Sequence, residues 1–297
     1  MITEPFEYFA PTSIEDALKL LTEFPSTSRL ISGGQSLVPL MNLGLSTPKQ
    51  IIDLKSITKE NLAYIVDDKE IRVGALTSHY DLGASDTIRK SCLILSEAAH
   101  SIGDSQVRNR GTIGGAVCHA DPSADYLPVM VTLEAIFQAD SPSGKRMIKS
   151  SEFFLDAFKT ALRQNEILTE IRIPKLLARP NTGGAFMKFN YVEGAFAIVC
   201  VAAIVSINNP RERKCESAKV TLGGIQTAPI VLNEIEAQFV GRTIDKKFFE
   251  DAGLAAVRAI DDPLSDIHAD GEYRRELGRV FTERALRLSV ERCVGTI

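Results

Sequence analysis

The sequence predicts an α+β fold in two parts, and three observations support this prediction. Near the N-terminus, a strand pattern at 29–31, a glycine pair, a short helical pattern and a second strand pattern at 51–54 resemble a small β-α-β unit. Residues 178–184 (Ala-Arg-Pro-Asn-Thr-Gly-Gly) mark a change of composition that indicates a linker. Beyond it, strand-like runs precede helical ones, the order of a compact α+β domain.

Periodicity and capping residues predict the remaining elements. Pro11 to Phe24 has a helical pattern that Thr12 or Ser13 caps, with Glu15 and Asp16 in its first turn. Further predicted helices cover 88–102, 127–133, 245–260 and 273–294. Further predicted strands cover 63–66, 70–75, 134–139, 166–174, 186–189, 197–207 and 218–225. Asp67 to Lys69 is a hairpin turn, 103–111 a polar loop and 121–125 a helix start.

Composition excludes several classes of function. The chain has 297 residues, 44% of them hydrophobic, and a formal net charge of -4, so it lacks the basic face that nucleic acid requires. Met1 to Phe9 has no signal-peptide pattern and no stretch is long enough to span a bilayer, which predicts a cytoplasmic protein. The five cysteines are odd in number and lack a Cys-x-x-Cys pair, so we expect reduced thiols rather than disulfides, zinc or iron–sulfur sites.

Two glycine pairs are the strongest candidates for a binding site. They lie in Ser32-Gly33-Gly34-Gln35-Ser36 and in Thr112-Ile113-Gly114-Gly115. Neither loop is a Rossmann fingerprint or a P-loop, and either pair alone is best explained as a tight turn. Together they suggest a cradle for a diphosphate, because glycine lets backbone N–H groups approach an anion and Gln35, Ser36, Thr112 and Asp125 add polar side chains.

Other polar residues near these loops have simpler explanations. Arg108 and Arg110 have the charge to neutralise phosphates, but arginines beside a turn more often brace it by bonding backbone carbonyls. His100, His119 and Asp121 do not have the spacing of a metal site. No nucleophile elbow or Ser/His/Asp arrangement is present, so no catalytic residue is predicted.

Three stretches closely resemble the FAD-binding subunit of molybdenum hydroxylases. They are residues 33–41 (Gly-Gly-Gln-Ser-Leu-Val-Pro-Leu-Met), residues 102–115 and His119-Ala120-Asp121-Pro122. The family includes the medium subunit of carbon monoxide dehydrogenase and the FAD domains of xanthine dehydrogenases and bacterial N-heterocycle dehydrogenases. The resemblance implies an FAD-binding fold of the vanillyl-alcohol-oxidase (PCMH) type in two subdomains, 1–57 and 58–177. A C-terminal α+β domain of the CO dehydrogenase flavoprotein type, 184–297, would follow.

The resemblance also implies a role for individual positions. Ile31, Ser32, Gly33, Gly34, Gln35, Ser36, Leu37 and Val38 would wrap the diphosphate of FAD, and Thr112, Ile113, Gly114 and Gly115 would complete the cradle. Asp125 would bind a sugar hydroxyl, Leu168 would pack against the cofactor and Lys188 would lie near the flavin end.

The chain departs from the family just after Lys188. Relatives often have Arg-x-Gly-Asp-Phe-Ala there, whereas this chain has Val192-Glu193-Gly194-Ala195-Phe196-Ala197, without the arginine or the aspartate. An acid in place of Ala195 would lie near the flavin, where its negative charge disfavours reduction. Tyr191 either offers an aromatic face to the ring or packs as an ordinary strand residue.

The implied function is that of one component in a heterotrimeric complex. This chain would carry FAD, a small subunit would hold the 2Fe–2S clusters, and a large molybdopterin subunit would hydroxylate the substrate. Carbon monoxide, a purine, a nicotine-type heterocycle and an aldehyde are all compatible substrates, because the large subunit selects the substrate. Two alternatives remain open: a stand-alone flavoprotein oxidoreductase of the same fold, and a non-catalytic nucleotide-binding partner in an assembly.

Overall fold

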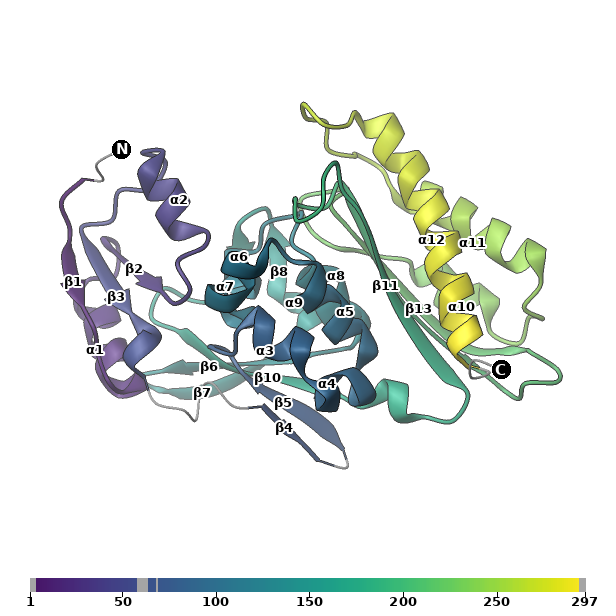
Figure 1. Ribbon diagram of the computed structural model, residues 1–297, viewed down its shortest axis with the longest axis horizontal. Coiled ribbons are helices and arrows are strands. Elements are labelled where there is room, and N and C mark those ends of the chain that lie inside the picture. The colour runs from purple at the N-terminus through teal and green to yellow at the C-terminus, as the bar shows by residue number, and fades with distance from the viewer. Residues whose placement is uncertain (1–3, 58–63, 68, 294–297) are drawn as a thin grey trace.

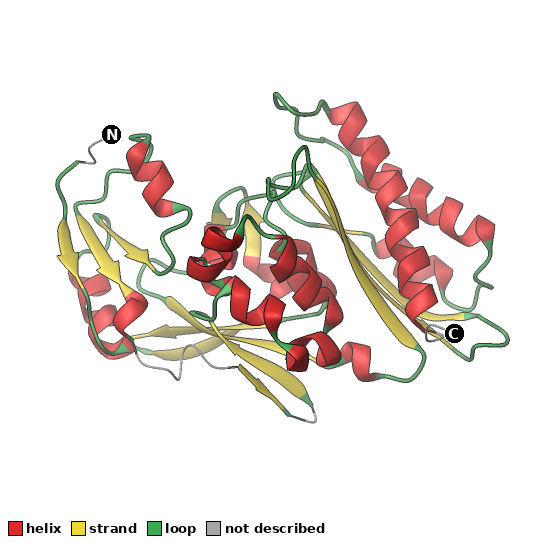
Figure 2. Cartoon of the chain, viewed as in Figure 1, coloured by secondary structure: helices red, strands yellow, loops and turns green. Residues whose placement is uncertain are grey.

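The computed structural model describes residues 4–57, 64–67 and 69–293. Within them, a three-stranded, a five-stranded and a four-stranded sheet follow one another along the long axis of the molecule (Figure 1). Helices pack between and against the sheets (Figure 2), so the chain has the predicted mixed α and β content. The predicted Ala63, the turn residue Asp68 and the helix end at Val294 lie outside the described residues.

The N-terminal sheet is parallel and contains the predicted β-α-β unit. Its strands have the order β1-β3-β2. The elements here are β1 (Glu7–Phe9), α1 (Ile14–Glu23), β2 (Ser28–Ile31), α2 (Leu37–Asn42), β3 (Gln50–Asp53) and the short 3-10 helix η1 (Leu54–Ser56). Helix α1 begins as predicted, because the hydroxyl of Ser13 accepts a hydrogen bond from the backbone N–H of Asp16. Its apolar face covers the sheet with Ala17, Leu18 and Leu21.

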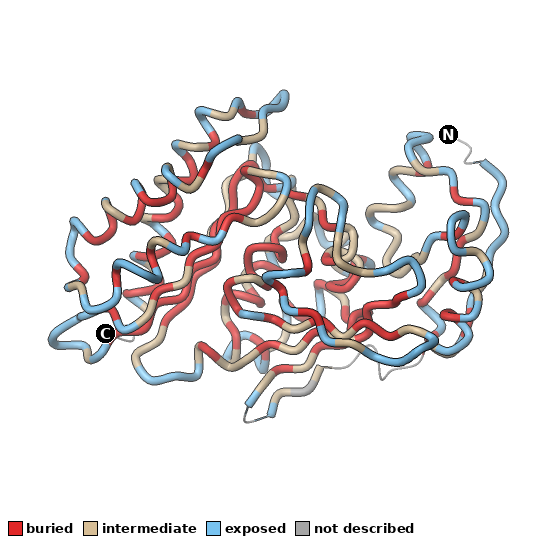
Figure 3. The backbone as a smooth tube through the Cα atoms, turned by 180° about the vertical axis from the view of Figure 1, so that it is seen from behind, coloured by how far each residue is buried: buried red, intermediate tan, exposed pale blue. Residues whose placement is uncertain are grey.

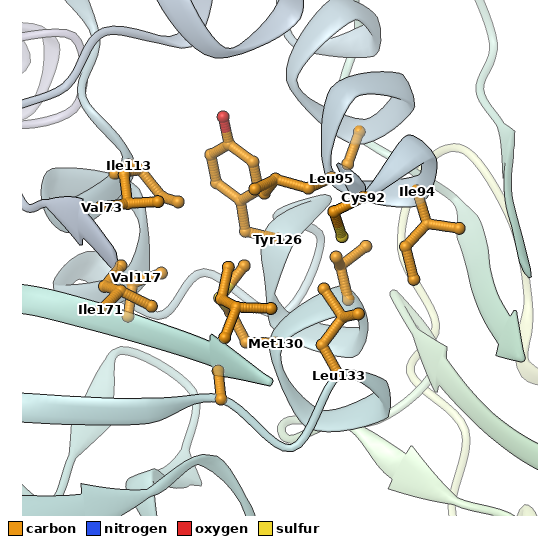
Figure 4. Packing of buried hydrophobic residues seen from close by; sticks show 14 of the residues in the cluster. Val73, Cys92, Ile94, Leu95, Ile113, Val117, Tyr126, Met130, Leu133 and Ile171 are labelled. Carbon is orange, nitrogen blue, oxygen red and sulfur yellow. The ribbon is translucent and has the colours of Figure 1, made fainter. Parts of the chain in front are cut away.

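The middle sheet is antiparallel and supports the main hydrophobic core. Its order is β4 (Tyr64–Val66), β5 (Glu70–Gly74), β10 (Ile167–Pro174), β6 (Ile136–Ser141) and β7 (Gly144–Lys149). One face carries the helices α3 (His79–Ala84), α4 (Asp86–Ser91), α5 (Leu93–Ser101), α6 (Ser105–Arg110), α7 (Ile113–His119), α8 (Tyr126–Thr132) and α9 (Ser150–Phe153). Buried side chains of the sheet, such as Val73 and Ile171, meet Ile113, Val117 and Tyr126 from the helices (Figure 4).

The C-terminal sheet is covered on both faces. Its strands are β11 (Thr182–Phe189), β12 (Val199–Ile207), β13 (Cys215–Gly223) and β14 (Ile230–Val231), in that order and antiparallel. Helices α10 (Asn233–Phe239), α11 (Lys246–Ala259) and α12 (Gly271–Cys293) pack on one side, and α5 and α8 of the middle layer pack on the other. Every residue of β12 is therefore buried, which explains its continuous run of apolar residues.

Three sequence predictions were wrong in detail. The helix expected over 88–102 is interrupted at Cys92, whose non-helical backbone (φ -154°, ψ 78°) separates α4 from α5. The polar loop expected over 103–111 contains α6, which lacks a buried side chain and forms because Asp104 caps it by accepting from the N–H of Val107. The predicted linker ends early, since residues 182–184 already pair with β12.

Several short elements were not predicted. They include β1, η1, β7, α9, the hairpin of β8 (Phe154–Asp156) and β9 (Lys159–Thr160), the 3-10 helix η3 (Leu176–Ala178), β14 and α10. The cysteines are unpaired as expected, four of them buried and Cys118 half-buried. Among the helices that the structure describes, none combines the length and the apolar character needed to cross a membrane.

Candidate functional site

The first glycine pair lies in a loop with free hydrogen-bond donors. Residues 32–36 connect β2 to α2 at the carboxyl end of the parallel sheet. The backbone N–H groups of Gly33, Gly34, Gln35 and Ser36 donate to no acceptor within the part of the chain that the structure describes. Gly34 has a left-handed backbone (φ +74°), which turns successive N–H groups toward one side and suits glycine. The loop therefore has the donors that an anion requires.

The second glycine pair is internally satisfied. Thr112 is the N-cap of α7, and its hydroxyl accepts the N–H of Gly115 at 3.1 Å. The N–H of Gly114 donates to the carbonyl of Ala75 at 2.8 Å, and Ile113 is fully buried. The pair is thus the first turn of a helix packed against the middle sheet, not an open loop.

The two glycine loops lie far apart in the sequence but meet in space, as a shared cradle for one diphosphate requires. The hydroxyls of Ser32 and Thr112 are 2.9 Å apart. A Cβ on Gly33 would lie 2.1 Å from the carbonyl oxygen of Arg110, and one on Gly115 would lie 2.9 Å from the Ser32 hydroxyl. Glycine is therefore needed at Gly33, where a Cβ would meet backbone atoms, whereas a Cβ on Gly115 would have to displace the hydroxyls of Ser32 and Thr112.

A pocket of about 650 Å³ opens beside the first loop. Its walls include Tyr8, Asp53 and the cations Lys55 and Arg110. The phenol of Tyr8 donates a hydrogen bond to the carboxylate of Asp53 at 2.7 Å. Sequence reasoning missed Tyr8, Asp53 and Lys55. For Asp53 the available signal was the predicted β-α-β unit, because the carboxyl ends of its two parallel strands, where Ile31 pairs with Asp53, lie at one edge of the sheet. The lining also includes Ile31, Ser32, Gly33, Gly34, Gln35, Val38, Pro39, Asn42 and Ser56.

A buried ion pair joins two further predicted residues. Lys188 on β11 donates to Asp125, which precedes α8, at 2.9 Å, and also to the carbonyl of Ser101 at 3.2 Å. Burial raises the pKa of Asp125 to about 6, although the Lys188 ammonium opposes that shift. The second carboxylate oxygen of Asp125 has no hydrogen-bond partner among the described residues. This oxygen is buried and free to accept a hydrogen bond from a ligand.

The residues that join α6 to α7, just before Thr112, contact a buried histidine, His79. His79 contacts the hydroxyl of Tyr126 through Nδ1 at 3.1 Å, and its backbone N–H donates to the carbonyl of Gly111. Burial, with a smaller contribution from the Arg108 charge, lowers the pKa of His79 to about 4, so the ring is neutral at pH 7. Arg108 itself donates to the carbonyls of Ile102 and Gly103 and so braces the turn, as expected.

The remaining predicted residues lie around these features. Leu37 and Val38 form the first turn of α2. Leu168 is buried on β10 in the main core, and its contact with a cofactor stays a prediction. Tyr191 is not a strand residue, because β11 ends at Phe189 and the Tyr191 ring is 75% exposed. Among the described residues, no group of three or more His, Cys, Asp or Glu side chains is arranged to hold a metal.

Comparison with protein-family models identifies the class of protein. Residues 4–176 match the FAD binding domain in molybdopterin dehydrogenase, and residues 184–289 match the CO dehydrogenase flavoprotein C-terminal domain. The chain therefore belongs to the FAD-binding family of the molybdopterin dehydrogenases, and its cofactor is FAD.

Individual relatives resemble the chain over its whole length. It is 37% identical to the 6-hydroxypseudooxynicotine dehydrogenase complex subunit alpha of Paenarthrobacter nicotinovorans, over 98% of this chain and 96% of that protein. It is 32% identical to the carbon monoxide dehydrogenase medium chain of Hydrogenophaga pseudoflava, over 99% of this chain and 100% of that one.

Solved structures confirm the fold. A structure of carbon monoxide dehydrogenase from Hydrogenophaga pseudoflava superposes with a TM-score of 0.94 at 32% identity, covering 99% of this chain and 100% of the matched chain. Quinoline 2-oxidoreductase from Pseudomonas putida 86 superposes with a TM-score of 0.90 at 28% identity, covering 98% and 99%. The fold class expected from the resemblance is thus confirmed.

Proposed function

We propose that this chain is the FAD-carrying electron-transfer subunit of a multi-subunit molybdenum hydroxylase. The observation that carries the proposal is the junction of the two glycine loops, where Ser32 and Thr112 touch beside four free backbone N–H groups. Such an arrangement suits a diphosphate, which has several acceptor oxygens and no need of a metal when N–H donors surround it.

The residues around the junction fit the rest of FAD. The pocket lined by Tyr8, Asp53 and Lys55 adjoins the first loop and has room and hydrogen-bonding groups for the adenosine half. In the other direction, the unpartnered oxygen of Asp125 would accept a hydrogen bond from a sugar-like hydroxyl. Lys188, held by Asp125 and Ser101, would lie near the flavin end. The proposal divides the chain into 1–57, 58–177 and 184–297, one part for each of the three larger sheets.

The proposed work of the protein is to hold the cofactor, not to perform acid or base chemistry on a substrate. When bound, FAD supplies a group that takes electrons singly and releases them in pairs, which suits a carrier between 2Fe–2S clusters and a final acceptor. The described residues contain no cluster of metal-ligating side chains, which supports locating those clusters and the molybdopterin on small and large partner subunits. Free thiols throughout support a reducing, cytoplasmic location.

Purification from the native host under mild conditions tests the proposal. We expect an affinity-tagged chain to carry about one FAD and to elute with iron and molybdenum in fixed ratio to flavin. A yellow chain without these metals that oxidises a substrate alone would instead indicate a stand-alone flavoprotein. A colourless chain in an assembly would indicate a non-catalytic nucleotide-binding partner.

A further inference from the structure

Two loops expose large apolar side chains at the end of the molecule where α12 begins. The loop between β11 and β12 exposes Tyr191 (75%), Val192 (57%) and Phe196 (64%), and the loop before α12 exposes Ile267 (95%). The loops touch, since the rings of Tyr191 and His268 are 6.0 Å apart. Both loops are exposed in Figure 3 and lie near the start of α12 in Figure 1. We call Tyr191, Val192, Phe196 and Ile267 the apical patch.

The turn that carries Ile267 is rigid. The carboxylate of Asp266 accepts the N–H groups of His268 and Ala269 at 2.8 and 3.0 Å, and the Asp266 N–H donates back to the Ala269 carbonyl. A second hydrogen bond closes the loop from Gly271 to the hydroxyl of Ser265 at 2.9 Å. An almost fully exposed isoleucine is therefore held in one position instead of folding back onto the protein.

The anchor of this turn is a buried arginine. Arg274, 2% exposed, pairs with Asp266 and also donates to the backbone carbonyls of Ile198 and Gly224. Ile198 lies immediately after the other apical loop, so the guanidinium of Arg274 ties both loops to the sheet. Such prior ordering reduces the entropy that a binding partner would otherwise have to remove.

The charge around the patch is mainly negative. Asp266 and Glu272 are paired with Arg274 and Arg275, but four further carboxylates in residues 190–198 and 261–273 have no ion-pair partner among the described residues, those of Glu193, Asp261, Asp262 and Asp270. An apolar centre with a charged rim is the usual anatomy of a protein interface. The acidic rim disfavours a second copy of the same face and favours a partner whose rim is basic.

The patch also lies next to the proposed flavin end. β11 ends one residue after Lys188, and the chain continues directly into Tyr191. A Cβ on Gly194 of this loop would lie 3.1 Å from the carbonyl of Gly103, just after the segment that holds the Lys188 ammonium. A protein docked on the patch would therefore lie beside the part of the site from which electrons must enter or leave.

We propose that the apical patch is the docking surface for the iron–sulfur subunit, whose matching face has an apolar socket for Ile267 surrounded by lysine and arginine. This inference rests on the proposed function, because it assumes that such a subunit exists. It adds which surface of this chain binds that subunit and the chemistry of the face that it meets.

The test introduces the substitution Ile267→Ser into the tagged chain, and the complex is then purified from the native host. We expect FAD per chain and the melting temperature to match the wild type, because the side chain touches little of its own protein. Association should weaken by about tenfold or more, as for a central anchor residue, and the iron-to-flavin ratio should fall accordingly. Added salt should release iron from the wild-type complex, since the rim is charged.

The matched control is Leu254→Ser on α11, which removes a 49% exposed leucine from the same domain and should keep the wild-type iron content. If Ile267→Ser keeps its iron as well, the patch is not the docking surface, although the chain is still a subunit. Equal loss in both variants, or a wild-type dimer of this chain that Ile267→Ser dissociates, also overturns the inference. A wild-type chain that carries FAD but no iron overturns the proposed function itself.

Discussion

The two glycine pairs look alike in the sequence but serve different purposes in the structure. At Gly33-Gly34 the backbone turns through a left-handed conformation and leaves N–H donors free. At Gly114-Gly115 the N–H groups are already bonded to Ala75 and Thr112, and the missing side chains allow α7 to approach its neighbours. The first pair provides donors, with Gly33 also allowing a close approach to Arg110, whereas the second pair only permits close packing. A glycine pair is therefore explained by what surrounds its N–H groups and its absent Cβ atoms.

The largest expected effect is the loss of FAD affinity caused by Gly34→Val. A β-branched residue resists φ +74°, so the free N–H groups would turn away from the ligand. Losing two charge-assisted hydrogen bonds at about 1.5 kcal/mol each weakens FAD binding about 100-fold or more. Gly115→Val should weaken binding by only about tenfold, since its Cβ displaces two hydroxyls that can rotate. Together, Gly34→Val and Gly115→Val should yield a folded chain that purifies without flavin.

Gly44→Val is the control for backbone strain. Gly44 has nearly the same φ (+72°), belongs to the same subdomain and has open space where a Cβ would go. Fluorescence titration of FAD into each apo-chain gives the affinities. The account fails if Gly44→Val and Gly34→Val lose flavin equally, or if the double variant keeps its full complement.

The buried ion pair contrasts with the neutral donors of the first loop. Lys188→Met leaves the Asp125 carboxylate buried without its counter-charge, which should cost about 3 kcal/mol of folding stability at pH 7. Asp125→Asn should cost much less, because it removes a carboxylate whose burial already costs stability at this pH, and the two changes together should cost less than the sum of the single changes. Urea denaturation of the apo-chains measures these values. Additive costs would show that the two groups do not interact.

The dependence of folding stability on pH should have opposite signs at His79, beneath the second loop, and at Asp125 in the buried ion pair. His79, with a pKa of about 4 against 6.5 when unfolded, costs stability as the pH falls below 6.5, up to about 3 kcal/mol. Asp125, with a pKa of about 6 against 3.8, costs stability as the pH rises from 3.8 to 6, again by up to about 3 kcal/mol. In the wild type these two contributions largely cancel.

Single variants separate the two contributions. Asp125→Asn should lose stability steeply on acidification, and His79→Gln should instead gain stability as the pH falls from 6 toward 4. Denaturation midpoints across this pH range provide the check. Slopes of the same sign in both variants would contradict the assignment of these groups.

The smallest expected effect is a change in the midpoint potential of the flavin. Ala195→Asp restores an acid at the position where relatives often have one, in the loop that follows Lys188. Its negative charge disfavours reduction of a nearby flavin, which should lower the midpoint potential by about tens of millivolts. Spectroelectrochemical titration decides the matter, and no change or a rise would refute this prediction. Glu193→Gln, in the same loop but two residues further from the start of β12, tests whether any charge there has the same effect.

The sequence predicted those elements whose patterns reflect burial or capping. Helix α1 has an apolar stripe and a serine cap, and β12 is a continuous apolar run, so both were found. Helix α6 has neither an apolar stripe nor a buried side chain, and its cap and Arg108 help to hold it, so the polar sequence favoured a loop. The cradle residues were found because glycine pairs are conspicuous.

Other parts of the site depend on tertiary contacts that leave no local signal. Tyr8 and Asp53 lie 45 residues apart and meet because β1, which was not predicted, pairs with β3. The pairing of Asp125 with Lys188 depends on how the middle and C-terminal layers pack, and only the family resemblance pointed to these two residues. The hydrogen bond of the Gly114 N–H became visible only with the carbonyl of Ala75 in place.

The central claim is that the loops at Gly33-Gly34 and Thr112 hold a diphosphate. Competition binding to the apo-chain tests it most directly, with FAD, riboflavin and ADP as ligands. The account predicts that FAD binds at least about 100-fold more tightly than riboflavin, because riboflavin lacks the adenosine and the two charge-assisted hydrogen bonds to the diphosphate, at about 1.5 kcal/mol each, and that ADP displaces FAD. Riboflavin binding as tightly as FAD, with no displacement by ADP, would contradict it.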